Sequence, residues 1–147
     1  FAKTCSEGDV RGFAAASGDT NRLHLEEEFA QQTRFGRRIV HGTLVSGLIS
    51  AALARLPGLT VYLSQELSFL GPVDVGAEAT AVCEVVESLG RDRYVLTTDV
   101  HVVDPGTPLS EPPESEPVVE GEAVVLVDPI ASEDADREAV EGTAGEE

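Results

Sequence analysis

The chain has 147 residues, which is enough for one domain with a sizeable hydrophobic core. Its formal net charge of −17 argues against nucleic acid as a partner, because binding there depends on neutralising phosphates with Lys and Arg. No apolar stretch of about 18 residues predicts a membrane-spanning helix, so we expect a cytoplasmic protein that does not bind membranes.

The basic residues are unusual, since Lys3 is the single lysine and the other nine are arginines. A surface rich in carboxylates repels itself in dilute buffer, whereas at about 1 M salt the Debye length falls to roughly 3 Å. The composition therefore favours a salt-adapted protein from a halophile. The alternative is an ordinary acidic cytosolic protein with an acidic tail.

The first third of the chain is predicted to be mainly helical. Residues 1–5 read as the end of a strand, and Ser6 is a suitable N-cap with acids in the turn that follows. Apolar residues at three- and four-residue spacing then predict a helix that Gly18 ends. Residues 26–32 predict a further short helix, and Asp19 is left on the turn directly after the first one.

The longest predicted helix covers residues 42–56 and ends at Pro57-Gly58. Large apolar side chains occupy one side of it, and Gly, Ser and Ala occupy the other. A helix with almost no charged face is expected to be buried by other structure.

From residue 60 onward the apolar residues alternate with period two, which predicts strands. The four predicted strands are residues 60–69, 78–88, 93–103 and 118–127. Residues 104–117 hold five of the eight prolines and four acids, which indicates a loop inserted between the last two strands. We expect one domain over residues 1–130, followed by an acidic disordered tail at 131–147.

These elements predict an α+β fold in which an antiparallel sheet packs against the long buried helix. A single sheet can cover the helix on one side only. The remaining sheet edge or face then needs a partner, and a homodimer is expected.

The polar residues that suggest chemistry lie in two turns. Asp19, Asn21 and His24 offer a carboxylate, an amide and an imidazole within six residues, and such groups can converge on one water molecule. Gly42 opens the long helix, where free N–H groups attract a developing negative oxygen. By spacing alone an Asx-turn with a surface histidine is the favoured interpretation. A metal site from Asp19, His24 and His41 lacks motif spacing, so neither metal nor cofactor is predicted.

The two turns resemble a known motif. Residues 17–24 read SGDTNRLH and residues 35–44 read FGRRIVHGTL, and together they resemble the hydratase 2 motif of MaoC-like (R)-specific enoyl-CoA hydratases. The similarity continues through residues 62–69 and the later strands, as far as residue 127. It implies a hotdog fold, a sheet wrapped around a long central helix, and a dimer that joins sheets side by side.

The resemblance also implies an activity and a catalytic pair. Asp19 and His24 would hold the water that adds to C3 of a trans-2-enoyl-CoA and would move a proton to C2. The Gly42 amide would hold the thioester oxygen. The product, an (R)-3-hydroxyacyl-CoA, could feed polyhydroxyalkanoate synthesis or fatty acid metabolism, and which of the pair performs each proton step is left open.

Supporting roles follow from the same resemblance. Asn21 would support the turn, Ser50 on the central helix would contact the catalytic group, and Leu53 would lie at the acyl pocket.

One residue departs from the motif, because the family commonly has a proline where this chain has Arg22. The change removes a restraint on the backbone angle φ. It also supplies a possible partner for a CoA phosphate, and Arg37 and Arg38 are further candidates for that role.

Three alternatives remain open at this point. The substrate could be another acyl thioester, branched, dicarboxylic or carried on acyl carrier protein. A hotdog thioesterase is disfavoured, because such enzymes generally use an acid near the central helix and residues 42–56 contain none. A non-catalytic acyl-CoA-binding subunit would bind the ligand without turnover.

Overall fold

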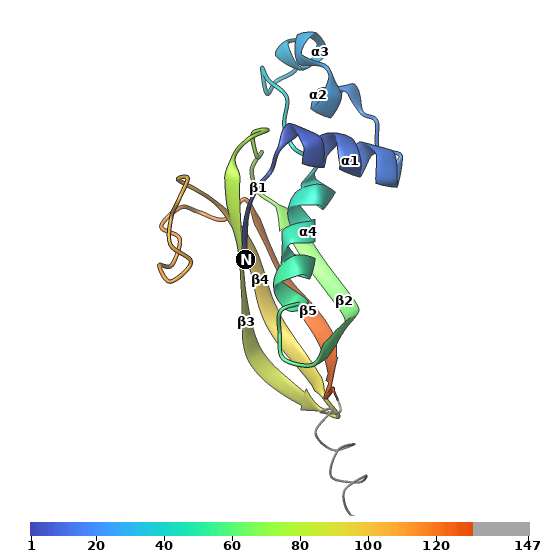
Figure 1. Cartoon of the computed structure of the whole chain (residues 1–147), viewed down its shortest axis with the longest axis vertical. Helices are drawn as coiled ribbons and strands as arrows, with labels where there is room; N and C mark the ends of the chain where they lie inside the picture. Colours follow the sequence, from blue (N-terminus) through green and yellow to red (C-terminus); the bar gives the residue numbers. More distant parts are fainter. Residues whose placement is uncertain (131–147) are drawn as a thin grey trace, which may run out of the picture.

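The computed structural model describes residues 1–130, and the tail predicted for residues 131–147 lies outside the described residues. A curled five-stranded antiparallel sheet packs along one central helix, as Figure 1 shows. Three short helices sit at one end of this sheet. The predicted α+β architecture is confirmed.

All strand pairs in the sheet are antiparallel, and the spatial order is β1-β3-β4-β5-β2. The strands are β1 (Ala2–Thr4), β2 (Leu59–Phe69), β3 (Glu78–Gly90), β4 (Arg93–Val103) and β5 (Val119–Asp128). Their ends fall within two residues of the predicted ones, because alternation of apolar residues marks a half-buried strand directly. Residues 104–117 form the expected loop.

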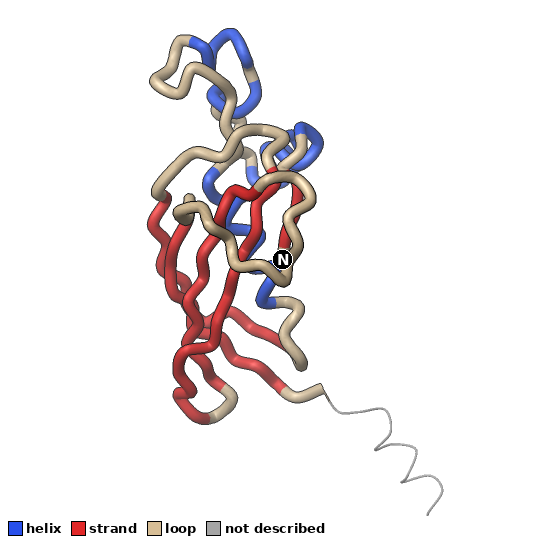
Figure 2. Tube along the Cα trace, turned by 90° about the vertical axis from the view of Figure 1, so that its left-hand side faces the viewer, coloured by secondary structure: helices blue, strands red, loops and turns tan. Residues whose placement is uncertain are grey.

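The central helix is α4 (Gly42–Leu53), which ends three residues earlier than predicted. Its buried side packs against the concave face of the sheet, and in Figure 2 the helix lies behind the strands. The buried side chains are Val45, Leu48, Ile49 and Leu53. The opposite side carries Gly47 and Ser50, which are exposed in the single chain.

Strand β2 forms one edge of the sheet, and large apolar side chains along it are exposed. Leu63 lies at an irregularity in the pairing with β5 and is 45% exposed. Farther along β2, the strand passes so close to Gly121 of β5 that a Cβ atom at Gly121 would stand 2.0 Å from the Glu66 carbonyl oxygen. A glycine is therefore required at this point of the pairing between β2 and β5.

Helix α1 (Glu7–Ser17) begins at a capping box formed by Ser6 and Asp9 and ends at Gly18, whose φ is 79°. Helices α2 (Arg22–Leu25) and α3 (Glu27–Gln31) follow, beyond the end of the sheet. The sequence did not predict α2, a single turn capped by Asn21. None of the helices in residues 1–130 is long and apolar enough to cross a membrane.

Candidate active site

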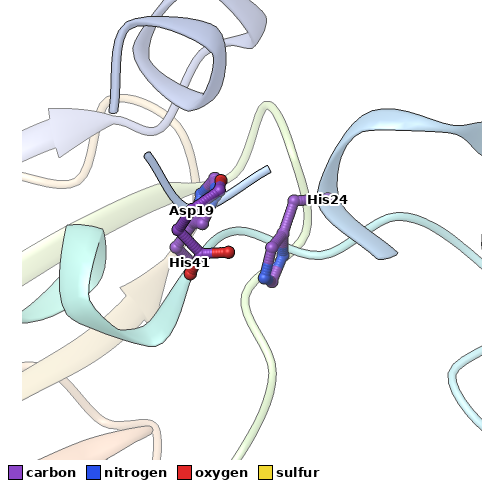
Figure 3. Close-up of side chains that lie close together, drawn as sticks. All are labelled: Asp19, His24 and His41. Atoms are coloured by element: carbon purple, nitrogen blue, oxygen red, sulfur yellow. The ribbon is translucent and has the colours of Figure 1, made fainter. Parts of the chain in front are cut away.

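Three side chains from three separate segments meet at the N-terminal end of α4. Asp19 comes from the turn after α1, His24 from α2, and His41 directly precedes α4. One carboxylate oxygen and one nitrogen of each ring all lie within 4.8 Å of one another, and Figure 3 shows this convergence. The structure thus brings together the two residues of the predicted pair, five positions apart in sequence.

The imidazole of His24 is buried, with a relative exposure of 8%. Its Nδ1 lies 2.7 Å from the carbonyl oxygen of Ile39. Because a carbonyl oxygen only accepts hydrogen bonds, Nδ1 must carry the proton and donate it. The other nitrogen, Nε2, then has a lone pair available to bind water or take up a proton.

Asp19 itself is exposed, and local hydrogen bonds shape its turn. Its Oδ1 accepts a bond from the Asn21 backbone N–H at 3.2 Å. The side-chain oxygen of Asn21 in turn accepts from the N–H of Leu23 at 3.1 Å, which caps α2. Asn21 therefore links the turn that carries the carboxylate to the helix that carries the imidazole.

Gly42 is the first residue of α4, so its N–H has no acceptor within the helix. A cavity of about 330 Å³ opens beside it, lined mainly by apolar side chains that include Phe35, Val45 and Phe69. The Phe69 ring lies close to Gly42, since a Cβ atom there would be 3.0 Å from two ring carbons. A carbonyl group could therefore approach this amide from an apolar cavity.

Arg38, one of the predicted phosphate partners, contacts Glu7 and the backbone of His24. Its side chain is only 15% exposed and forms an ion pair with Glu7, with Nη1 2.8 Å from the carboxylate. Its Nε donates to the carbonyl oxygen of His24 at 2.8 Å. The guanidinium is thus committed to holding the backbone of the histidine, a contact that no sequence spacing indicates.

The other two arginines predicted to bind phosphate also have carboxylate partners. Arg22 pairs with Glu26 and lies over the Phe29 ring, 4.4 Å from its centroid. Arg37 pairs with Asp74. Both pairs are exposed and can exchange partners at small cost in free energy, but the structure directs neither guanidinium toward the Asp19 and His24 side chains.

Ser50 and Leu53 do not meet Asp19 and His24, the predicted catalytic pair, within the chain. Ser50 lies on the exposed side of α4, about 12 Å along the helix from Gly42. It lines a groove between α4 and β2 together with Tyr62 and Gln65. Leu53 is 1% exposed and belongs to the hydrophobic core, not to an open pocket.

The cluster formed by Asp19, His24 and His41 has residue types that suit a metal ion. The two imidazole rings are tilted against each other, with centroids 3.9 Å apart and planes at 31°. Nδ1 of His24 and Nε2 of His41 each face a main-chain oxygen, which leaves one nitrogen of each ring for other contacts. These nitrogens and the Asp19 carboxylate suit acid–base chemistry.

Comparison with known proteins gives consistent results. Residues 2–104 match the model of the MaoC like domain. The chain is 43% identical over 138 residues to a 3-hydroxybutyryl-CoA dehydratase from Methylorubrum extorquens, covering 88% of this chain and 81% of that protein. It is 42% identical over 127 residues to an (R)-specific enoyl-CoA hydratase from Aeromonas caviae, covering 85% and 88%.

Solved structures show the same relationship. The (R)-hydratase from A. caviae, described as involved in polyhydroxyalkanoate (PHA) biosynthesis, superposes with a TM-score of 0.76 at 37% identity, over 87% of this chain and 92% of that one. An unliganded R-hydratase from Pseudomonas aeruginosa gives a TM-score of 0.75 at 36% identity, over 88% and 79%. The chain therefore belongs to the MaoC-like domain family and has the hotdog fold of its hydratases.

Proposed function

We propose that the protein is a hydro-lyase that adds water to a trans-2-enoyl-CoA and forms an (R)-3-hydroxyacyl-CoA. The observation that carries this proposal is the meeting of Asp19 and His24 beside the free amide of Gly42. Relatives named 3-hydroxybutyryl-CoA dehydratase and (R)-specific enoyl-CoA hydratase support it from both directions of the reaction. The product class suits polyhydroxyalkanoate synthesis or fatty acid metabolism.

In the proposed mechanism, Asp19 and the Nε2 of His24 hold one water molecule between them. The water oxygen forms a bond to C3 while one of its O–H bonds breaks, and the pair delivers a proton to C2. The thioester oxygen gains negative charge during this step, and the Gly42 N–H donates a hydrogen bond to it. Water supplies every atom that is added, so the reaction needs no cofactor.

We also propose that the protein works as a homodimer joined through β2. Within residues 1–130 this edge strand pairs with β5 on one side only, and it carries five large exposed apolar side chains. They are Leu59, Val61, Tyr62, Leu63 and Phe69. The adjacent side of α4, with Gly47 and Ser50, has small side chains that permit close approach.

The proposal extends to domain organisation and salt adaptation. Residues 1–130 act as one hydratase domain, with 104–117 as an inserted loop. Five of the nine basic residues in 1–130 form ion pairs, so many carboxylates are left to repel one another. We expect concentrated KCl to raise both the activity and the stability, because it screens this repulsion.

The test follows the loss of enoyl-thioester absorbance with crotonyl-CoA in about 2–3 M KCl, with chiral analysis of the product. The Asp19→Asn and His24→Gln variants are expected to lose about 10²- to 10⁴-fold in kcat. Asp104→Asn and His101→Gln change the same residue types in or beside the 104–117 loop and should leave kcat unaltered.

Full activity in Asp19→Asn would exclude the proposed mechanism. Faster turnover of thioesters on acyl carrier protein would change the substrate class but keep the chemistry. Binding of crotonyl-CoA without turnover, in protein shown to be folded, would favour a non-catalytic subunit.

A further inference from the structure

We propose that His41 is a positioning residue for the hydration reaction, because its ring holds both members of the catalytic pair. This inference rests on the proposed function. The His41 side chain is 1% exposed, and its Nε2 lies 3.0 Å from the main-chain oxygen of Asp19. Its ring stacks on the His24 ring at a centroid distance of 3.9 Å.

The direction of the bond to Asp19 follows from its acceptor. A carbonyl oxygen cannot donate, so the Nε2 of His41 must carry the proton. His24 has the opposite tautomer, with the proton on Nδ1, because that nitrogen faces the Ile39 oxygen at 2.7 Å. The two stacked rings therefore each use one N–H to fix a segment of main chain.

The other nitrogen of His41 is unusual for a residue that only packs. Nδ1 is buried and has no hydrogen-bond partner among residues 1–130. A buried polar atom without a partner costs free energy, and an apolar side chain of similar size would avoid that cost. Phe13 already supplies an aromatic neighbour on this side, at 4.8 Å between centroids. The bond from Nε2 to the Asp19 segment explains why a histidine is useful here.

The position of His41 in the chain strengthens this assignment. It is the N-cap of α4 and directly precedes Gly42, the residue whose amide is proposed to hold the thioester oxygen. The bond to Asp19 spans 22 residues of sequence and attaches the exposed catalytic turn to the start of the central helix. One residue thus sets the distance between the carboxylate, the imidazole and the oxyanion donor, which have to be correctly spaced for the reaction.

Three variants separate the donor function from ring packing. His41→Gln keeps an N–H that can reach the Asp19 oxygen, His41→Phe keeps the ring but loses the donor, and His41→Ala loses both. We expect His41→Ala to lower kcat for crotonyl-CoA about 100-fold with less than about a threefold change in KM. His41→Gln should recover at least about tenfold of that loss, and His41→Phe should stay about tenfold or more below the wild type.

The matched control is His101→Ala. His101 also donates from a ring nitrogen to a carbonyl oxygen, that of Ser115 at 2.7 Å, but its partner is in the 104–117 loop. The kcat of the His101→Ala variant should equal that of the wild type. A His41→Phe variant as active as the wild type, or a His41→Gln variant no better than His41→Ala, overturns the proposal.

A measurement on the wild type covers the case in which the variants fail to fold. NMR of protein with ¹⁵N-labelled histidine rings reports which nitrogen carries the proton. We expect the proton on Nε2 of His41 and on Nδ1 of His24. If His41 carries its proton on Nδ1 and none on Nε2, the proposal is overturned. Failure of the proposed function has a different signature, namely full activity in Asp19→Asn, which leaves the tautomer result unaffected.

Discussion

The body of the molecule and its catalytic segment are held by different forces. The body, made of the sheet and α4, has a continuous core in which Ile49, Leu96 and Val100 are completely buried. The catalytic segment, residues 18–41, contributes only three buried apolar side chains, those of Ala30, Ile39 and Val40. Its own parts are joined to one another instead by hydrogen bonds from side chains to main-chain oxygens.

This difference has a functional consequence. Burial of apolar surface is non-directional, so the body tolerates small shifts as long as it stays filled. Hydrogen bonds depend on distance and angle, so each one fixes the orientation of the group it holds. We therefore expect substitutions in the body to change mainly stability. Substitutions of the residues that donate these hydrogen bonds, His24, Arg38 and His41, should change mainly activity.

The largest expected effect on the body is that of Gly121→Ala. The added methyl group would collide with the Glu66 carbonyl oxygen and force β5 and β2 apart. We expect the free energy of unfolding to fall by about 3 kcal/mol, measured by denaturant titration in KCl. Gly12→Ala in α1 is the control, because its methyl group meets open space and should add about 0.5–1 kcal/mol. Unchanged stability in Gly121→Ala would contradict the pairing of these strands.

The second prediction tests the proposed surface of the body. Leu63→Glu places a charge on the β2 edge, where two copies would have to bury it, and should convert the dimer to a monomer at micromolar concentration. Sedimentation equilibrium measures the mass directly. Leu109→Glu introduces the same charge at a residue that is 68% exposed in the 104–117 loop, and this control should remain dimeric. A dimeric Leu63→Glu variant would place the interface elsewhere.

The third prediction concerns the hydrogen bond from Arg38 to the His24 oxygen within the catalytic segment. Arg38→Met removes the N–H donor to the His24 oxygen and the ion pair with Glu7 while keeping much of the side-chain volume. We expect kcat to fall about tenfold and the free energy of unfolding to fall by about 1–2 kcal/mol. Arg11→Gln, the control, breaks only the exposed pair with Glu7 and should cost less than about 0.5 kcal/mol without loss of activity. Normal kcat in Arg38→Met would show that this attachment has no catalytic role.

The smallest effect is a pH dependence at the same attachment. The hydrogen bond from Arg38 lowers the pKa of the Glu7 carboxyl, and the charge of Arg38 and the contact with Arg11 act in the same direction. A folded-state pKa below the unfolded value stabilises the protein above the unfolded pKa, and this contribution is lost as pH falls through the folded pKa. Glu7→Gln should thus lower the melting temperature at about pH 7, and the difference from the wild type should shrink as the pH falls below the unfolded pKa of about 4.3 and vanish below the folded-state pKa.

The control for that experiment is Glu28→Gln, which removes one negative charge from an exposed position on α3. It corrects for the change in net charge. A difference between wild type and Glu7→Gln that persists in acid would have a cause other than the ionised carboxylate.

The elements of the body could be predicted well from the sequence. Alternation with period two located the strands, and the sequence of Ser6, acids and Gly18 located both ends of α1. These signals are local, so each can be read from a few consecutive residues. The meeting of Asp19 with His24 was also predictable, since both belong to one short motif.

The hydrogen bonds that join the parts of the catalytic segment could not be predicted. Arg38 was one of three arginines considered for a CoA phosphate, and nothing local distinguishes the one that meets the His24 oxygen 14 residues away. The bond from His41 to Asp19 spans 22 residues and depends on how the chain folds back between them. The four residues of α2 are too few to show a helical period in the sequence. The cap at Asn21 is the local feature that stabilises this turn.

The acceptors of these attachments have a consequence for how the protein can evolve. His24, Arg38 and His41 each donate to a main-chain oxygen, and every type of residue offers such an oxygen. Ile39 provides the acceptor for His24 while its side chain lines the cavity beside Gly42. Position 39 can therefore change, by mutation or by design, to reshape this cavity without removing the acceptor that orients the imidazole.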